Sequence, residues 1–447
     1  MNIEQFQQKL LEDGKNSGFG DMEVYFEKST RFACQVYKGE LDHYETAEDG
    51  GLSFRGTYNG KMGYAYTEKL DEESITFLLE SAKANAEVIE DEEQDDIFAG
   101  SDSYEDIDFY SKSLDEVPIP DKIAFLKEVE SKVANYDSRI ASINSCKLIE
   151  QSNERVLANS KGLSLHERKN YLALVLSVIV KHEEETKSGF QVEITKDFTS
   201  LNADEIAKKA ADEALSYLGG KSIASKKYPI ILRNDAAADL LGTFVSVFSA
   251  EIAQKGRSLL KDKEGEKIAA EKLTVIDDPF HEDGFDSRNF DGEGVASKIC
   301  SVIENGTLKT LLHNRKTATK SGVETTGHAY KASYKGTLTV APSNFYVVPG
   351  KKNRDELVNS LNEAVIVTKL SGLHSGANAV SGNFSVAAQG FYVKDGKVST
   401  PVKQMTIAGN FFELLKEIQE VGSDLYFATS GIGAPSLLVK ELSVTVE

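Results

Sequence analysis

The same order of elements, helix then antiparallel strands then helix, occurs twice in the first half of this chain. Residues 2–16 carry apolar side chains at helical spacing, and alternating segments follow over residues 22–67. KGE, EDGG and YNGK punctuate these segments and predict turns between antiparallel strands. Residues 71–90 return to helical spacing. We therefore expect a first unit of helix, antiparallel meander and helix.

A second unit of the same kind follows an acidic connector at residues 91–118. Residues 119–136 have helical spacing, and residues 139–198 contain long alternating runs such as YLALVLSVIVKH. An alanine-rich helix is expected at residues 203–218. The order of elements predicts an N-terminal α+β domain over residues 1–220 that contains an internal duplication.

The composition changes after residues 219–227, a glycine, serine and lysine segment that we interpret as a linker. A short buried strand, an apolar helix at 235–251, and strands separated by DGEG, ENG, VPG, SGN and KDG turns come next. Two more helices are expected at 353–365 and 410–420. Residues 228–447 therefore predict a second domain, mainly antiparallel β with packed helices. The fold class is α+β, and 447 residues are too many for one ordinary core.

The net charge of −20 excludes several classes of partner. Nucleic-acid binding needs basic patches, and a membrane-surface helix needs a basic face, so we expect neither a nucleic acid nor a membrane as partner. No run of about 18 apolar residues is present, and the first residues do not resemble a signal peptide. Three cysteines lie far apart. These features predict a cytoplasmic protein with reduced thiols.

The short sequence motifs of this chain do not form a complete active site. The chain has seven histidines, none within five residues of another, so a zinc-binding helix with two histidines is absent. His281 and Glu282 begin such a motif but lie in a loop. Ser375 lacks the GxSxG setting of a nucleophile, and Cys300 lies in an alternating strand. No catalytic residue is predicted from these motifs.

Polar, turn-rich loops between apolar strands are the remaining candidates for binding. They include DGEGVASK, HNRKTATKSG, TTGHAYK and GLHSGANAVSGNFS. Their asparagine and serine side chains could hydrogen-bond the backbone of an extended peptide. The candidate residues for a peptide cavity or a subunit interface in these loops are Glu293, His328, His374, Asn378 and Asn383.

Six stretches in register carry a resemblance to a known family. They are FRGTYNGKMGYAYT, FDGEGVASK, LLHNRKTATKSG, APSNFYVVPG, SGNFSVAAQGFYVKDGK and PVKQMTIAGNFFELLKEIQEVGSDL. Over essentially its whole length the chain resembles the PmbA/TldD family, the so-called modulators of DNA gyrase. The resemblance implies a two-domain α+β fold and a heterodimeric, zinc-dependent peptidase acting on unfolded or extended peptides. In that pair, the TldD subunit binds zinc through an HExxxH helix and a later cysteine.

The chain departs from the metal-binding pattern and resembles the PmbA subunit, also called TldE. Matching IILRNDAAADLLG to the motif puts Arg233 and Ala238 where the histidines stand and Asn234 where the glutamate stands. The late cysteine is also missing, because ATSGIGAPS follows VGSDLYF. Arginine and alanine cannot hold zinc. We therefore expect no metal or other cofactor in this chain and zinc in a TldD-like partner.

The leading hypothesis is a non-catalytic subunit that shapes the peptide cavity of such a pair. One alternative is a stand-alone metallopeptidase with His374 or His328 brought near Glu293; another is a homodimeric peptide-binding protein. The expected helix 235–251 is apolar around most of its circumference, more than one core normally needs. Phe244 and Phe248 are therefore interface candidates, and a homodimer is expected when the partner is absent.

Overall fold

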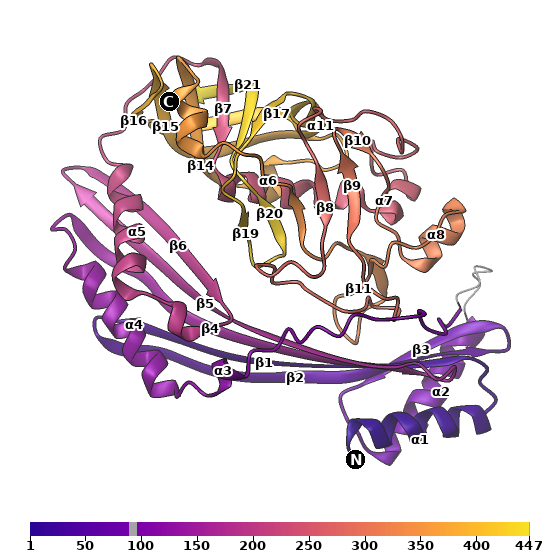
Figure 1. Cartoon of the computed structure of the whole chain (residues 1–447). Coiled ribbons are helices and arrows are strands. Elements are labelled where there is room, and N and C mark those ends of the chain that lie inside the picture. The colour runs from indigo at the N-terminus through magenta and orange to yellow at the C-terminus, as the bar shows by residue number, and fades with distance from the viewer. Residues whose placement is uncertain (89–95, 447) are drawn as a thin grey trace.

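The computed structural model describes residues 1–88 and 96–446, so the last two residues of the expected helix 71–90, the first part of the acidic connector (91–95) and residue 447 lie outside the described residues. The N-terminal half forms one long curved sheet with helices packed near its two ends, and the β-rich C-terminal half lies over the opposite face of that sheet (Figure 1). The architecture confirms the expected α+β class.

The first helix–meander–helix unit is present in the predicted order. Its elements are α1 (Ile3–Asn16), β1 (Met22–Tyr37), β2 (Glu40–Tyr58), β3 (Lys61–Thr67) and α2 (Glu72–Val88). KGE and YNGK are two-residue hairpins whose central residues have positive φ. EDGG was wrongly predicted as a turn, because β2 continues through it. Gly51 there lets Tyr334 of the C-terminal half approach the strand, since a Cβ would lie 2.3 Å from the Tyr334 ring.

The second unit repeats this order. Its elements are α3 (Lys112–Asp115), α4 (Ile119–Ala134), β4 (Ile140–Asn159), β5 (Ser164–His182), β6 (Glu185–Thr195), the 3₁₀ helix η1 (Phe198–Ser200) and α5 (Ala203–Ser216). The two meanders join through antiparallel pairing of β1 with β4, from Glu23 opposite Asn159 to Gln35 opposite Lys147. The result is one six-stranded sheet in the order β3-β2-β1-β4-β5-β6.

The alternation of side chains assigns the two faces of this sheet. Cys146, Leu148 and Leu174 point to the face that α4 and α5 cover. Tyr25 and Leu157 point to the opposite face, where they pack against Phe290 and Tyr334 of the C-terminal half. The middle of the sheet therefore presents one set of alternate residues to the C-terminal half.

The C-terminal half contains a closed barrel. Strands β14, β7, β21, β17 and β15 pair in that order, and pairing of β14 with β15 closes the ring, with β16 and β18 attached at its edges. A second sheet has the order β10-β9-β8-β13-β20-β19, and β11 pairs with β12. The strands are β7 (Lys226–Leu232), β8 (Val275–Asp277), β9 (Cys300–Glu304), β10 (Thr307–Leu308), β11 (Ala329–Lys331), β12 (Leu338–Val340), β13 (Phe345–Val347), β14 (Glu363–Ser371), β15 (Asn383–Lys394), β16 (Lys397–Pro401), β17 (Met405–Asn410), β18 (Ile418–Val421), β19 (Tyr426–Phe427), β20 (Ile432–Ala434) and β21 (Leu437–Val446).

Three expected helices in this half are shorter than predicted. The expected helix 235–251 is divided into α6 (Asn234–Phe244), the 3₁₀ turn η2 (Val245–Phe248) and α7 (Ala250–Gln254). The expected helices 353–365 and 410–420 end early, at α9 (Arg354–Asn359) and α11 (Phe411–Lys416), because the β-branched residues that follow them enter the barrel as β14 and β18. The remaining helices are α8 (Arg315–Ser321) and α10 (Leu373–Gly376).

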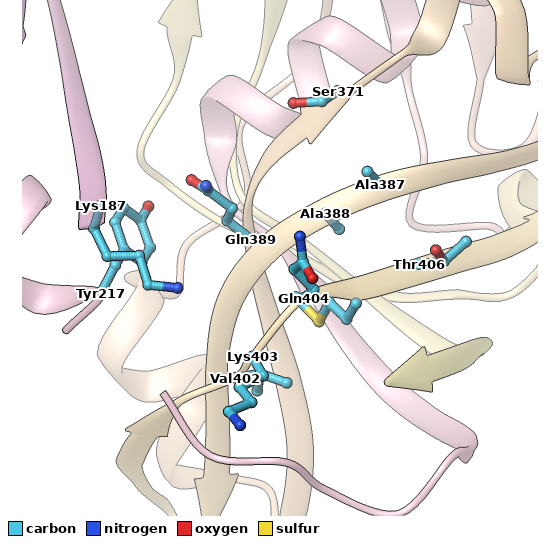
Figure 2. Close-up of a pocket in the computed structure, with 11 residues that line it drawn as sticks. Lys187, Tyr217, Ser371, Ala387, Ala388, Gln389, Val402, Lys403, Gln404 and Thr406 are labelled. Carbon is cyan, nitrogen blue, oxygen red and sulfur yellow. The ribbon is translucent and has the colours of Figure 1, made fainter. Parts of the chain in front are cut away.

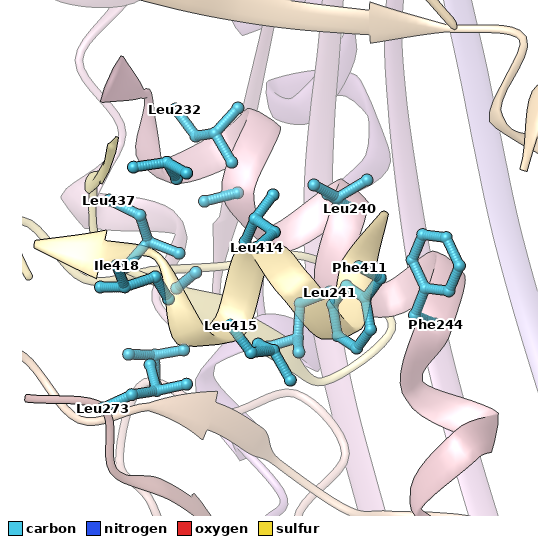
Figure 3. Packing of buried hydrophobic residues seen from close by; sticks show 14 of the residues in the cluster. Leu232, Leu240, Leu241, Phe244, Leu273, Phe411, Leu414, Leu415, Ile418 and Leu437 are labelled. Atoms are coloured by element: carbon cyan, nitrogen blue, oxygen red, sulfur yellow. The ribbon is translucent and has the colours of Figure 1, made fainter. Parts of the chain in front are cut away.

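The apolar helix α6 lies inside the core of its own chain. Figure 3 shows Leu240, Leu241 and Phe244 packed beside residues of α11. The ring of Phe244 stacks on Phe411 at 4.5 Å, and the ring of Phe248 lies 5.3 Å from that of Phe345. Both phenylalanines are 0% exposed. The prediction that Phe244 and Phe248 face a partner is therefore wrong, because the barrel, strands β19 and β20 of the second sheet, and α11 pack against the helix and bury both side chains.

Among the described residues, no helix is both long enough and apolar enough to cross a membrane.

Candidate functional site

An arginine occupies the start of α6, where the resemblance placed a zinc ligand. Arg233 is the N-cap residue, and its guanidinium is bonded on several sides. Nε and Nη2 donate to Asp235 at 2.7 and 2.6 Å, and Nη1 donates to Glu213 of α5 at 2.9 Å. Nη2 also donates to the Thr368 carbonyl oxygen at 3.0 Å. A fixed positive charge with these partners repels a metal cation rather than binding it.

The other two positions of the motif also lack metal-binding capacity. The Asn234 amide donates to the Asp424 carbonyl oxygen at 2.9 Å, which fixes the loop after β18 against α6. Ala238 is 1% exposed and belongs to the hydrophobic core. Across residues 1–88 and 96–446, no group of three or more His, Cys, Asp or Glu side chains is placed to hold a metal ion. The residues at this position therefore do not fit zinc.

His328 and Glu293 are buried, and each is engaged in the packing of loops. His328 Nε2 lies 3.0 Å from Asp277 Oδ1, and its Nδ1 lies 2.8 Å from the Thr326 hydroxyl. Glu293 accepts a hydrogen bond from the Arg315 amide at 2.9 Å. Burial and the neighbouring Asp291 carboxylate raise the pKa of Glu293 to about 7. Both ring nitrogens of His328 have partners, which counts against the alternative of a metallopeptidase built on His328.

The loop with His374, Asn378 and Asn383 is exposed and follows ordinary turn chemistry. His374 lies in the single-turn helix α10 and is exposed. Asn378 Oδ1 accepts from the amides of Val380 and Ser381, both at 3.0 Å. Asn383 Oδ1 accepts from the Asn410 side chain at 2.9 Å. These residues lie on the surface of the barrel, and His374 and Glu293 are in no common group that could hold a metal in the described part of the chain.

A first pocket, the junction pocket, lies where α5 and β6 meet the barrel (Figure 2). Its volume is about 280 Å³. Lys187 and Tyr217 enter from the N-terminal half, and the Tyr217 hydroxyl lies 2.6 Å from the Thr368 hydroxyl. The remaining lining residues come from the barrel and are Ser371, Ala387, Ala388, Gln389, Val402, Lys403, Gln404, Met405 and Thr406.

A second pocket, the interdomain pocket, lies between the middle of the N-terminal sheet and the C-terminal half. Its volume is also about 280 Å³, and it is more strongly charged than the junction pocket. Strands β1, β4 and β5 supply its floor, and the loop at 286–288 together with β11 supplies its other side. Its lining residues are Tyr25, Glu27, Asn153, Glu154, Arg155, Glu167, Lys169, Asp286, Arg288, Ala329, Tyr330, Lys331 and Ala332.

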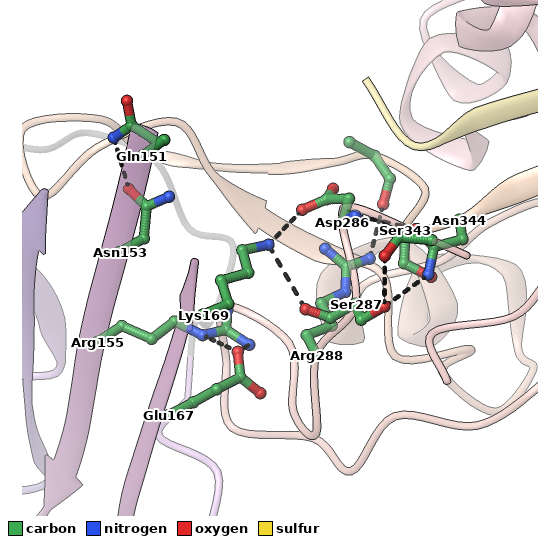
Figure 4. Close-up of polar contacts among 12 residues, drawn as sticks. Gln151, Asn153, Arg155, Glu167, Lys169, Asp286, Ser287, Arg288, Ser343 and Asn344 are labelled. Atoms are coloured by element: carbon green, nitrogen blue, oxygen red, sulfur yellow. Dashed lines mark hydrogen bonds and ion pairs between the residues drawn. The ribbon is translucent and has the colours of Figure 1, made fainter. Parts of the chain in front are cut away.

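An ion pair, a hydrogen bond and a cation–π contact between the two halves hold this pocket together (Figure 4). Arg155 pairs with Glu167 at 2.9 Å, and its guanidinium lies 4.3 Å from the centre of the Phe290 ring. Glu167 also accepts from the Asn289 amide. Lys169 of β5 pairs with Asp286 at 2.6 Å. These contacts connect strands β4 and β5 to the loop at 286–290.

Burial perturbs the titration of two groups in this pocket. Lys331 donates to the Ser53 hydroxyl at 2.6 Å and lies over the rings of Tyr25 and Tyr64. Burial lowers the pKa of Lys331 to about 7. Burial also raises the pKa of Glu27 above its usual value. Strongly shifted ionisable groups beside a pocket are typical of functional sites.

Sequence reasoning missed the interdomain pocket. The available signal was weak: β4 is polar on both faces around residues 150–155, whereas its C-terminal end is apolar. A strand that is polar on both faces in its middle indicates a contact other than a hydrophobic core. This pattern does not indicate which distant parts of the chain cover residues 150–155.

Comparisons with known proteins assign the family. Sequence profiles of three domains match this chain: PmbA/TldA metallopeptidase domain 1 at residues 22–86, the central domain at 112–218 and the C-terminal domain at 225–446. An uncharacterised protein of Methanocaldococcus jannaschii is 31% identical over 416 residues, 92% of this chain and 93% of its own length. Metalloprotease PmbA of Escherichia coli O157:H7 is 26% identical over 440 residues, 97% of this chain and 93% of its own length.

Solved structures agree with this assignment. A crystal structure from Thermotoga maritima, described as a proposed modulator of a DNA gyrase, has a TM-score of 0.93 and 32% identity over 99% of this chain and 100% of its own. TldE from Thermococcus kodakarensis has a TM-score of 0.89 over 98% of this chain and 100% of its own; its 22% identity supports the fold alone. The fold and the matches over nearly the full length define a two-part α+β protein of the metallopeptidase type. The chain belongs to the PmbA/TldD family.

Proposed function

We propose that this chain is the non-catalytic, TldE-like subunit of a heterodimeric TldD/TldE metallopeptidase that acts on unfolded or extended peptides. One observation carries the proposal: Arg233 is bonded to Asp235 and Glu213 at the position where the sequence resemblance places a zinc-binding histidine of the catalytic subunit. A catalytic zinc site needs about three protein ligands, and this helix supplies none of those expected from the motif.

In this proposal, zinc and the catalytic glutamate belong to a TldD-like partner. This chain would contribute the long N-terminal sheet and its polar pockets to the cavity that receives the peptide. The net charge of −20 argues against nucleic-acid binding. This argument holds although some relatives are described as modulators of DNA gyrase. A homodimer of the chain without its partner remains part of the proposal, although buried Phe244 and Phe248 no longer support it.

Co-expression with an HExxxH-bearing paralogue tests the proposal. We expect the two chains to co-purify, and we expect an unfolded peptide to be cleaved by the pair but not by this chain alone. The decisive control replaces the glutamate of the partner's HExxxH motif with glutamine, which should abolish cleavage by the complex while leaving its assembly intact. Cleavage by the isolated chain, or full activity of the complex with that control partner, would contradict the assignment.

A further inference from the structure

Two buried polar atoms of the interdomain pocket have no hydrogen-bond partner among the described residues. The first is Nε of Arg288, a side chain that is 4% exposed and whose Nη2 donates to the Ala341 carbonyl oxygen at 3.3 Å. The second is Oε2 of Glu27. Both residues line the pocket. Because buried donors and acceptors are nearly always paired, a donor and an acceptor are expected from a molecule in this pocket.

The charges around these atoms narrow the chemistry of that molecule. The lining contains four carboxylates and four cationic side chains, Glu27, Glu154, Glu167 and Asp286 against Arg155, Lys169, Arg288 and Lys331. A phosphate or another simple anion would pair with Arg288 but would leave the Glu27 oxygen without a donor, because Glu167 and Asp286 already pair with Arg155 and Lys169. A cation alone would leave the Arg288 donor unpaired. A molecule with both charges satisfies the donor and the acceptor together.

The size of the pocket limits the molecule to a small one. About 280 Å³ lies just below the usual range for small-molecule sites, roughly 300–1,000 Å³. We propose that the interdomain pocket binds a zwitterion of the amino-acid or short-peptide class, with its carboxylate on Arg288 and its ammonium group on Glu27. Arginine recognises carboxylates well because its donors lie in a rigid plane.

This inference rests on the pocket and does not depend on the proposed partnership. Ligand binding is measured on this chain alone. If the chain bound no ligand, the result of the cleavage experiment with the TldD/TldE pair would keep its meaning. Conversely, inactivity of a TldD/TldE pair would not remove a binding signal from the isolated chain.

Isothermal titration of the full chain with four ligands is the first test. The ligands are free alanine, Ala-Ala, N-acetyl-Ala-Ala and Ala-Ala amide. We expect Ala-Ala, free alanine or both to bind, and the better of these two identifies the source of the zwitterion. N-acetyl-Ala-Ala lacks the ammonium group and Ala-Ala amide lacks the carboxylate. Each should bind about tenfold or more weakly than Ala-Ala, as expected for loss of a charge-assisted hydrogen bond.

Two variants then assign the two ends of the ligand. Arg288→Lys keeps the positive charge but removes Nε, so it should weaken Ala-Ala and N-acetyl-Ala-Ala about equally. Glu27→Gln should abolish the preference for Ala-Ala over its acetylated form. Glu304→Gln, at an exposed position on β9, is the matched control and should change nothing.

Circular dichroism shows whether each variant is folded; where one is not, the ligand series on the unmodified chain decides alone. No binding of any ligand at millimolar concentration, the result for a pocket that holds only water, would overturn the inference. Equal affinity for free and capped dipeptides would also overturn it.

Discussion

Arg233 Nη1 donates to Glu213 Oε2 over 2.9 Å, and this ion pair joins the start of α6 to α5 of the N-terminal half. The same arginine binds Asp235 through two parallel bonds, so one guanidinium orients two carboxylates that would otherwise repel each other. The position at which the sequence resemblance places a metal ligand of the catalytic subunit is therefore a structural connection between the two halves in this chain.

Replacing Arg233 should destabilise the protein. Arg233→Ala leaves Glu213 and Asp235 partly buried without their cation, and we expect a loss of about 1–3 kcal/mol in the free energy of unfolding. Arg233→Lys should recover part of this loss, because it restores the charge without the planar donors. Urea denaturation measures both effects. Lys440→Ala, which removes an exposed ion pair with Glu417, is the control and should cost less than about 1 kcal/mol.

Gly51 should be intolerant of a side chain. A Cβ at this position would lie 2.3 Å from the Tyr334 ring and 2.7 Å from the Thr67 carbonyl oxygen. Gly51→Ala is therefore expected to disturb the contact of the β11–β12 segment with the N-terminal sheet and to cost about 1–3 kcal/mol. Gly336→Ala is a control in the same segment, because the nearest atom to its Cβ would be 3.4 Å away. Equal urea midpoints for the two variants would refute the expectation.

The sequence predicted the regular parts of the fold and none of the long-range contacts. Alternation and the hairpin signals KGE and YNGK were sufficient for both meanders, because these are local properties of the chain. EDGG was wrongly predicted as a turn because glycine is common in turns and also at positions where another part of the chain lies very close to a strand. Only the contact of Gly51 with the distant Tyr334 shows that the second case applies here. Phe244 and Phe248 were wrongly predicted at an interface because apolar residues all around a helix are equally consistent with burial between two sheets of the same chain.

The candidate site shows the same limit. Arg233, Asn234 and Ala238 could be singled out by comparison with a motif, but the partners of Arg233 are 20 and 135 residues away for Glu213 and Thr368. Glu27 and Arg155 lie opposite each other in the N-terminal sheet, but Arg288 reaches them only when the two halves pack together. No pattern within one segment encodes that packing, so the interdomain pocket could be found only in the structure.

The pH dependence of stability should reveal the state of Lys331. Burial holds its pKa at about 7 in the folded protein, whereas an unfolded lysine titrates near 10.5. Between these values the unfolded chain binds the extra proton, so raising the pH disfavours unfolding. The wild type should gain stability relative to Lys331→Met from pH 7 upward, by at most about 1.4 kcal/mol per pH unit.

Urea midpoints measured between pH 7 and 9.5 test this expectation. Lys309→Met is the control, because Lys309 is exposed and, within residues 1–88 and 96–446, forms its ion pair with the exposed Glu304 across the β9–β10 hairpin. Its stability relative to the wild type should stay constant over the same range. If the urea midpoints of the wild type and of Lys331→Met change with pH in the same way, the pKa of Lys331 in the folded protein is equal to that of an unfolded lysine, and the expectation is contradicted.

The metal content of the purified chain is the last prediction. We expect no stoichiometric zinc, because Arg233 carries a fixed positive charge, Ala238 has no donor atom and the described residues contain no group of three or more potential ligands. Elemental analysis after dialysis against a weak chelator measures it, and a TldD-type chain purified in the same way serves as the positive control. His328→Gln should leave the value unchanged, because His328 is bonded to Asp277 and Thr326 in the folded chain. One equivalent of zinc retained by the wild type would refute the prediction, and its loss in His328→Gln would place the metal at that histidine.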